Sequence, residues 1–139
     1  MISVTIPGPP VPQGRPRIFV RGQRAHGVDP PRSKSWKGMA QVHMLEVCEK
    51  PFGRDTPVGV EIKAIFPCPR SDFRKREPRE ARWHTKRGDI DNVAKAVLDA
   101  GQGVLWEDDC QVCWLLARKW IGAQGDSPRV EIDVWEVDR

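Results

Sequence analysis

Carboxylates are concentrated at two places in this chain, and their spacing suggests metal chemistry. Asp89 and Asp91 stand two residues apart, and Lys95 follows Asp91 by four residues. A second acidic group consists of Glu107, Asp108 and Asp109. Carboxylates packed together repel one another unless a cation lies between them, and hard divalent metals prefer oxygen ligands. A metal among acids, in a chain whose net charge is +4, indicates chemistry on phosphate.

The spacing of Asp89 and Asp91 predicts where a helix can begin. On a helix the two side chains would point about 200° apart, whereas in extended chain they point the same way. We therefore expect the helix to begin at or after Asp91, with Ile90 directed into the core. The carboxylates then lie where a loop meets a helix N-terminus, and Asp91 or Asn92 can serve as the N-cap. A helix cap with a neighbouring acid is the alternative explanation of this pair.

Lys95 is unusual near the start of a helix, because the positive end of the helix dipole disfavours cations. It could form salt bridges with Asp91 and Asp99, or it could hold a phosphate oxygen and stabilise charge at a scissile bond. Asp109 belongs to an acidic turn that precedes a strand. If that end of the strand lies beside the helix start, three carboxylates converge, which suits Mg²⁺ with several waters retained.

Other motifs are weaker. Cys110 and Cys113 have CxxC spacing but no partner pair, and the three histidines do not cluster in the sequence, which disfavours a zinc site. The chain contains no glycine-rich phosphate loop, serine elbow or HExxH motif. Trp83 lies within a basic stretch and could stack on bases or wedge between them.

Basic residues gather in two runs before the second acidic group. Residues 14–37 carry seven basic residues and one acid, and residues 69–87 carry eight basic residues and three acids. Such runs fit the electrostatic footprint of a polyanion binder, and solvated flexible loops are the alternative. Because two such runs accompany the acidic cluster in one chain, we favour nucleic acid as the partner.

Hydrophobic periodicity predicts the elements that must position these residues. The predicted strands cover residues 2–6, 58–66, 111–120 and 130–134. The predicted helices run from Ser33 or Ser35 to Cys48, and from about 92 to 101. We expect a loop or an irregular hairpin over 11–32 and a basic, flexible loop over 69–87. The segment 111–120 is apolar on both faces, so it is either a central strand or part of a subunit interface.

This order of elements predicts an α+β fold. We expect a single domain over residues 1–139, with a mixed β-sheet of about four or more strands and two main helices packed on it. The N-terminus lacks the features of a signal peptide, and no apolar segment approaches membrane-spanning length. Without a secretory signal, the four cysteines are expected to be reduced. We therefore expect a cytoplasmic protein with no membrane partner.

The acidic region closely resembles the signature of the RusA family of Holliday junction resolvases. That signature is Asp-x-Asp-Asn, then a Lys four residues beyond the second Asp, then an Asp-Asp-x-Gln turn, and it matches residues 89–100 and 103–112 here. Residues 8–17 look like a common opening of the family. Lys119 matches a basic residue often found late in the following strand.

The resemblance implies a structure-selective endodeoxyribonuclease that acts as a homodimer on four-way DNA junctions. It would depend on Mg²⁺, with Mn²⁺ able to substitute. By position, Asp89, Asp91 and Asp109 would be the metal-binding catalytic acids and Lys95 the catalytic lysine. A homodimer also suits a two-fold junction that needs two cuts. The alternatives are a nuclease for other branched DNA and a non-catalytic DNA-binding protein.

The family is commonly encoded by phages or prophages, which suggests a role in recombination, repair or phage DNA processing. We expect the DNA to be held through its backbone, with salt-sensitive affinity. The residues predicted to contact DNA are Arg15, Arg17, Arg74, Lys75, Arg76, Lys86, Arg87 and Lys119.

Overall fold

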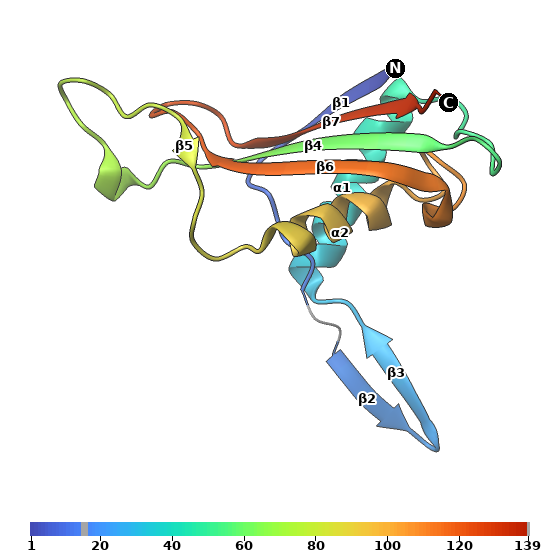
Figure 1. Ribbon diagram of the computed structural model, residues 1–139. Coiled ribbons are helices and arrows are strands. Elements are labelled where there is room, and N and C mark those ends of the chain that lie inside the picture. The colour runs from blue at the N-terminus through green and yellow to red at the C-terminus, as the bar shows by residue number, and fades with distance from the viewer. Residues whose placement is uncertain (15–16, 139) are drawn as a thin grey trace.

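A five-stranded mixed sheet, with strand order β1-β7-β4-β6-β5, forms the centre of the fold (Figure 1). The computed structural model describes residues 1–14 and 17–138. The strands of this sheet are β1 (Ile2–Pro7), β4 (Val58–Phe66), β5 (Arg82–Trp83), β6 (Val112–Ile121) and β7 (Arg129–Glu136). β4 and β6 are parallel, whereas the other neighbouring pairs are antiparallel. With two helices packed on this sheet, the predicted α+β fold is confirmed.

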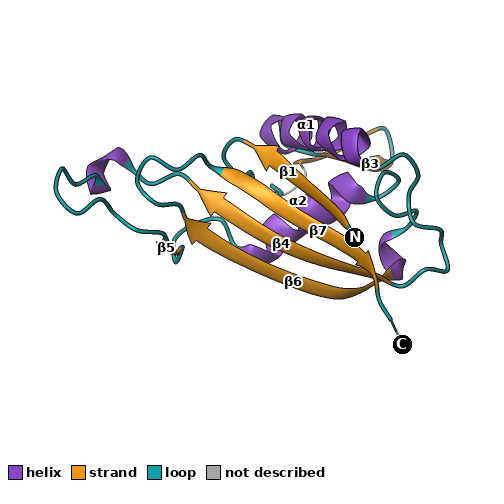
Figure 2. Ribbon diagram, turned by 90° about the horizontal axis from the view of Figure 1, so that it is seen from above, coloured by secondary structure: helices purple, strands orange, loops and turns teal. Residues whose placement is uncertain are grey.

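The helices α1 (Pro31–Val47) and α2 (Ile90–Gly101) lie on the same face of the sheet (Figure 2). α1 begins two residues before the predicted Ser33, with Pro30 as its N-cap. Proline suits the first helical position because its fixed φ matches the helix and its missing N–H would lack a helical partner there. Within the described ranges, neither helix has the length and hydropathy needed to cross a membrane.

The core lies between the two helices and the sheet. α2 contributes Val93, Ala96 and Val97, the three residues predicted to be buried. Trp106 is fully buried just beyond the end of α2. Gly101 makes this packing possible, because a Cβ at that position would lie 2.4 Å from the indole ring of Trp106. The tight contact anchors the acidic turn that follows.

The two remaining strands form a hairpin that extends away from the sheet (Figure 1). β2 (Arg17–Arg21) and β3 (Arg24–Val28) pair in antiparallel register across a turn in which Gly22 has φ +67°. This segment was expected to be a loop or an irregular hairpin, and it forms a regular one. Arg17 begins β2, and the predicted DNA contact at Arg15 lies outside the described residues.

The basic segment 69–87 leaves the sheet and returns to it as β5. It contains a 3₁₀ turn (Arg70–Asp72), and Arg82 forms an ion pair with Asp72 across the segment. The Gln124 side chain accepts from the Arg74 N–H at 2.9 Å and donates to the Arg74 carbonyl at 3.0 Å. The segment therefore has defined contacts with the body of the protein at its tip and at its return.

Candidate functional site

Asp89 and Asp91 lie at the start of α2, at the predicted junction of a loop and a helix. Asp89 is the N-cap, with extended backbone angles (φ −60°, ψ 140°). The helix thus begins at Ile90, one residue earlier than predicted, because the extended chain ends at Asp89 and not at Asp91. Asp91 lies in the first turn. Ile90 was expected in the core, but as the first helical residue it is 43% exposed.

The Asp89 carboxylate does not perform the usual task of an N-cap side chain. An aspartate at this position commonly accepts a hydrogen bond from an N–H of the first turn, but Asp89 makes no side-chain cap bond. Its side chain is exposed, as is that of Asp91. Two neighbouring carboxylates are therefore presented to solvent where a cation or a ligand can reach them.

Lys95 is exposed one turn beyond Asp91. Among the ion pairs of the described residues, none within 4.0 Å involves Lys95. The salt bridges with Asp91 and Asp99, which were the alternative to a role at a phosphate, therefore do not form. Burial raises the pKa of the Asp99 carboxyl, and the nearby charges of Lys95 and Lys37 partly oppose that rise. The Lys95 ammonium thus remains available to another anion.

Asp109 lies at the opposite end of α2. Its N–H donates to Oε1 of Gln102, the C-cap of that helix, at 3.2 Å, and its carboxylate accepts from Nε1 of Trp106 at 2.7 Å. A helix of 12 residues is about 18 Å long, which separates Asp109 from the helix start. The three carboxylates were expected to converge only if Asp109 lay beside the start of this helix.

That convergence is therefore wrong for a single chain. In residues 1–14 and 17–138, no three acidic, histidine or cysteine side chains are placed to hold one metal ion. The reason lies in the topology. α2 is the crossover between the parallel strands β4 and β6, so the residues that enter it and leave it stand at opposite ends of the sheet.

The turn around Asp109 is built by its neighbours. Asp108 caps a 3₁₀ turn (Asp109–Gln111) by accepting from the Cys110 N–H at 3.0 Å, and this bond lowers the pKa of the Asp108 carboxyl. Gln111 is buried; its Oε1 accepts from the Asp108 N–H and its Nε2 donates to the carbonyl of Gly53. In the Asp-Asp-x-Gln spacing, Asp108 and Gln111 thus form a capping box. The carboxylate of Asp109 is not part of that box.

Lys119 holds the chain directly before Asp89. Its Nζ donates to the carbonyls of Lys86 and Gly88, each at 2.8 Å. Gly88 has φ +102°, a conformation that glycine adopts at little cost. The sequence signal for this contact was only a basic residue late in a strand, and it had suggested a DNA contact. The backbone contacts of Lys119 were not predicted.

The other predicted DNA contacts fall into two groups. Arg74, Lys75 and Arg76 are exposed along the outer part of the basic segment, and Lys86 and Arg87 are exposed immediately before Gly88 and Asp89. His84 stands between these groups, and its Nδ1 accepts from the Lys86 N–H at 3.2 Å. Burial lowers the pKa of His84, and the Lys119 ammonium lowers it further, so His84 adds no charge near neutral pH.

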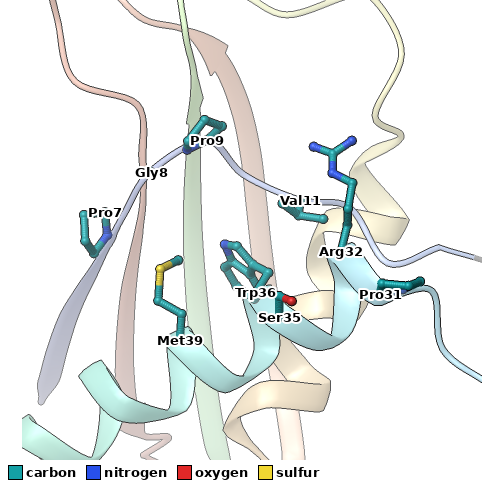
Figure 3. A pocket seen from close by; sticks show the side chains of 9 residues that line it. All are labelled: Pro7, Gly8, Pro9, Val11, Pro31, Arg32, Ser35, Trp36 and Met39. Atoms are coloured by element: carbon teal, nitrogen blue, oxygen red, sulfur yellow. The ribbon is translucent and has the colours of Figure 1, made fainter.

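A cavity of about 430 Å³ lies between the end of β1 and the start of α1 (Figure 3). It is lined by proline residues, Trp36 and Met39, with Arg32 at its edge. The buried Nε1 of Trp36 has no hydrogen-bond partner among the described residues. None of the residues predicted to act on a phosphate lines this cavity, and no sequence motif pointed to it.

The four cysteines are free, as expected.

Comparisons with known proteins identify one family and two relatives. The family model described as "Endodeoxyribonuclease RusA" matches residues 7–135. An uncharacterized protein, YqaN of Bacillus subtilis (strain 168), is 33% identical over 142 residues, covering 98% of this chain and 96% of YqaN. A protein of Lactococcus phage r1t, named crossover junction endodeoxyribonuclease rusA, is 28% identical over 87 residues, covering 62% of this chain and 60% of the phage protein.

Proposed function

The chain belongs to the RusA endodeoxyribonuclease family, and from that premise we propose that it resolves four-way DNA junctions as a Mg²⁺-dependent homodimer. The observation that carries the proposal is the family match over residues 7–135, which contains Asp89, Asp91, Lys95 and Asp109. The name of the phage r1t relative supports junction DNA as the substrate. Recombination, repair and phage DNA processing are the settings that such an activity would serve.

Asp89 and Asp91 fit a hard divalent cation. Mg²⁺ takes carboxylate oxygens and keeps several waters, and these two exposed carboxylates leave room for both waters and a DNA phosphate. When bound, Mg²⁺ would activate a water and neutralise charge on the phosphate. Lys95 would hold a phosphate oxygen beside them, because its ammonium follows Asp91 by one helical turn.

A second protomer can supply the missing third carboxylate. β6 pairs with β4 along one edge, but its other edge meets β5 only at Trp120 and Ile121. In the described structure, this leaves residues 112–118 of that edge without a strand partner. The same stretch exposes Trp114, Leu115 and Leu116 by 57%, 45% and 44%. A long apolar edge of this kind favours pairing with another chain.

An antiparallel pair of two such edges has a defined geometry. If residues 112–118 of both protomers pair with each other, the two-fold axis passes near Leu115. Val112 of one protomer then lies opposite Arg118 of the other. The Asp109 turn of the partner then reaches the end of β6 where Lys119 holds Gly88 next to Asp89. Each site of the proposed dimer therefore combines Asp89, Asp91 and Lys95 of one chain with Asp109 of its partner.

Junction selectivity and metal dependence can be tested together. We expect the protein to introduce paired nicks into a synthetic four-way junction in Mg²⁺, and to leave a linear duplex of the same sequence intact. EDTA should abolish the cleavage, because the carboxylates would lose the cation that they position. End-labelled strands on a denaturing gel measure both results. Equal cutting of the duplex would contradict junction selectivity, and undiminished cutting in EDTA would contradict the metal.

Lys119→Met should weaken cation binding without unfolding the protein. Removing the ammonium releases the carbonyls of Lys86 and Gly88 and loosens the chain that positions Asp89. Loss of such supporting contacts typically reduces metal affinity by roughly 10- to 100-fold. Titration of Mn²⁺ followed by electron paramagnetic resonance measures this, with Lys63→Met on the neighbouring strand as the control. Unchanged affinity in Lys119→Met would show that Lys119 does not position the site.

A further inference from the structure

Trp83 is a large aromatic residue that lies outside the hydrophobic core. It is 59% exposed, although one face of its ring stacks on Trp120 at a centroid distance of 3.9 Å and an interplanar angle of 22°. Pairing of β5 with β6 places the two residues opposite each other. The ring is therefore held rigidly by a strand and by a stacked neighbour, while its other face remains open.

Trp120 is the middle layer of a short column. The Nζ of Lys63 lies 5.7 Å from the centroid of the Trp120 ring. Since β4 and β5 flank β6 on opposite sides, Lys63 and Trp83 approach Trp120 from opposite sides. A cation at one end of an aromatic column and an open ring face at the other end favour a further flat ring as the next layer.

The position of Trp83 ties this column to the proposed cleavage site. The N–H of the next residue, His84, donates to the carbonyl of Lys119 at 3.3 Å. The ammonium of Lys119 in turn holds Gly88, which directly precedes Asp89. Lys119 of β6 thus hydrogen-bonds to His84, the residue after Trp83, and to Gly88, the residue before Asp89.

The positive charge around Trp83 is complementary to the negative charge of a nucleic acid. The segment 69–87 that contains it carries eight basic residues and three acids, and five of the basic residues were predicted from sequence to contact DNA. Exposed aromatic rings among such charges bind unpaired bases by stacking, because every base has a flat face and the backbone is attracted to the cations. A partner protein surface gives no comparable reason for the positive charge.

We propose that the exposed face of Trp83 receives an unpaired DNA base next to the point of cleavage. The identity of the ligand as DNA rests on the proposed function, and the stacking itself rests on the geometry of Trp83, Trp120 and Lys63. A four-way junction offers bases that can leave their stacks where the strands exchange. Trp83 would therefore favour branched DNA over a continuous duplex, in which each base face is already covered.

Binding to a fluorescein-labelled single strand, measured by anisotropy in EDTA, tests the proposal without any cleavage. We expect Trp83→Ala to weaken single-strand affinity by roughly 5- to 140-fold, the range associated with loss of one stacked base. Trp83→Phe should retain most of the affinity, because the smaller ring can still stack. A junction with 2-aminopurine at the crossover should gain fluorescence on binding wild type and lose that gain with Trp83→Ala.

Phe73→Ala is the matched control, because Phe73 is a 48% exposed aromatic residue of the same segment and should leave affinity unchanged. Equal affinity of wild type and Trp83→Ala would overturn the stacking proposal, as would an equal loss in Phe73→Ala. So would a change of oligomeric state in Trp83→Ala with DNA affinity intact, which would mark a protein contact. A wild-type protein that binds through Trp83 but never cuts would overturn only the proposed function.

Discussion

Replacing Asp91 with asparagine should lower junction cleavage by on the order of 10³-fold or more, the range reached when charge stabilisation is lost in phosphoryl transfer. Asparagine keeps the size of the side chain but removes the charge that attracts a hard cation. Asp91 is exposed in the first turn of α2, so the helix should lose at most about 1 kcal/mol of dipole interaction. Single-turnover cleavage of a labelled junction in Mg²⁺ measures the effect.

Affinity separates a catalytic role from a general one. Junction binding in EDTA should be the same for Asp91→Asn and wild type, because the lost carboxylate serves the cation and not the DNA backbone. Asp55→Asn is a suitable control, since Asp55 is an exposed carboxylate in a turn between α1 and β4. It should cleave at the wild-type rate. An Asp91→Asn protein that cuts as well as Asp55→Asn would remove Asp91 from the proposed site.

Several regular elements of the fold could be predicted because their hydrophobic residues follow a clear period. Alternation in 58–66 and 130–134 identified β4 and β7, and the stripe of Val93, Ala96 and Val97 identified α2. The hairpin formed by β2 and β3 was less visible, since its arginines and glycines resemble those of a loop. β5 has only two residues, and its pairing with β6 depends on a contact between tryptophans distant in sequence.

The candidate site was predictable in its parts but not in its assembly. The two-residue spacing of Asp89 and Asp91 placed them at a helix start to within one residue, because extended chain and helix orient such a pair differently. The position of Asp109 depends on the direction in which the chain crosses from β4 to β6, which no local pattern contains. The contacts of Lys119 with Gly88 likewise join segments 31 residues apart.

The separation of the acids makes the dimer part of the proposed chemistry. Two-fold pairing along β6 would give each site Asp91 from one chain and Asp109 from the other. A mutation of Asp91 and a mutation of Asp109 in different chains of one dimer would then fall in the same site. The other site of that dimer would be complete. If each chain instead built its own site, both sites of the mixed dimer would be defective.

A mixed dimer of Asp91→Asn and Asp109→Asn chains should therefore nick junctions, although each homodimer is inactive. Purification through two different tags ensures that every dimer contains one chain of each kind. One of the two sites in each mixed dimer should be active. The product should therefore be a junction nicked in one strand and not a pair of resolved duplexes. A mixed dimer of Asp89→Asn and Asp91→Asn chains is the matched control and should remain inactive, because both of its sites lack a carboxylate. Absence of nicking in the first pair would show that Asp109 does not act across the dimer.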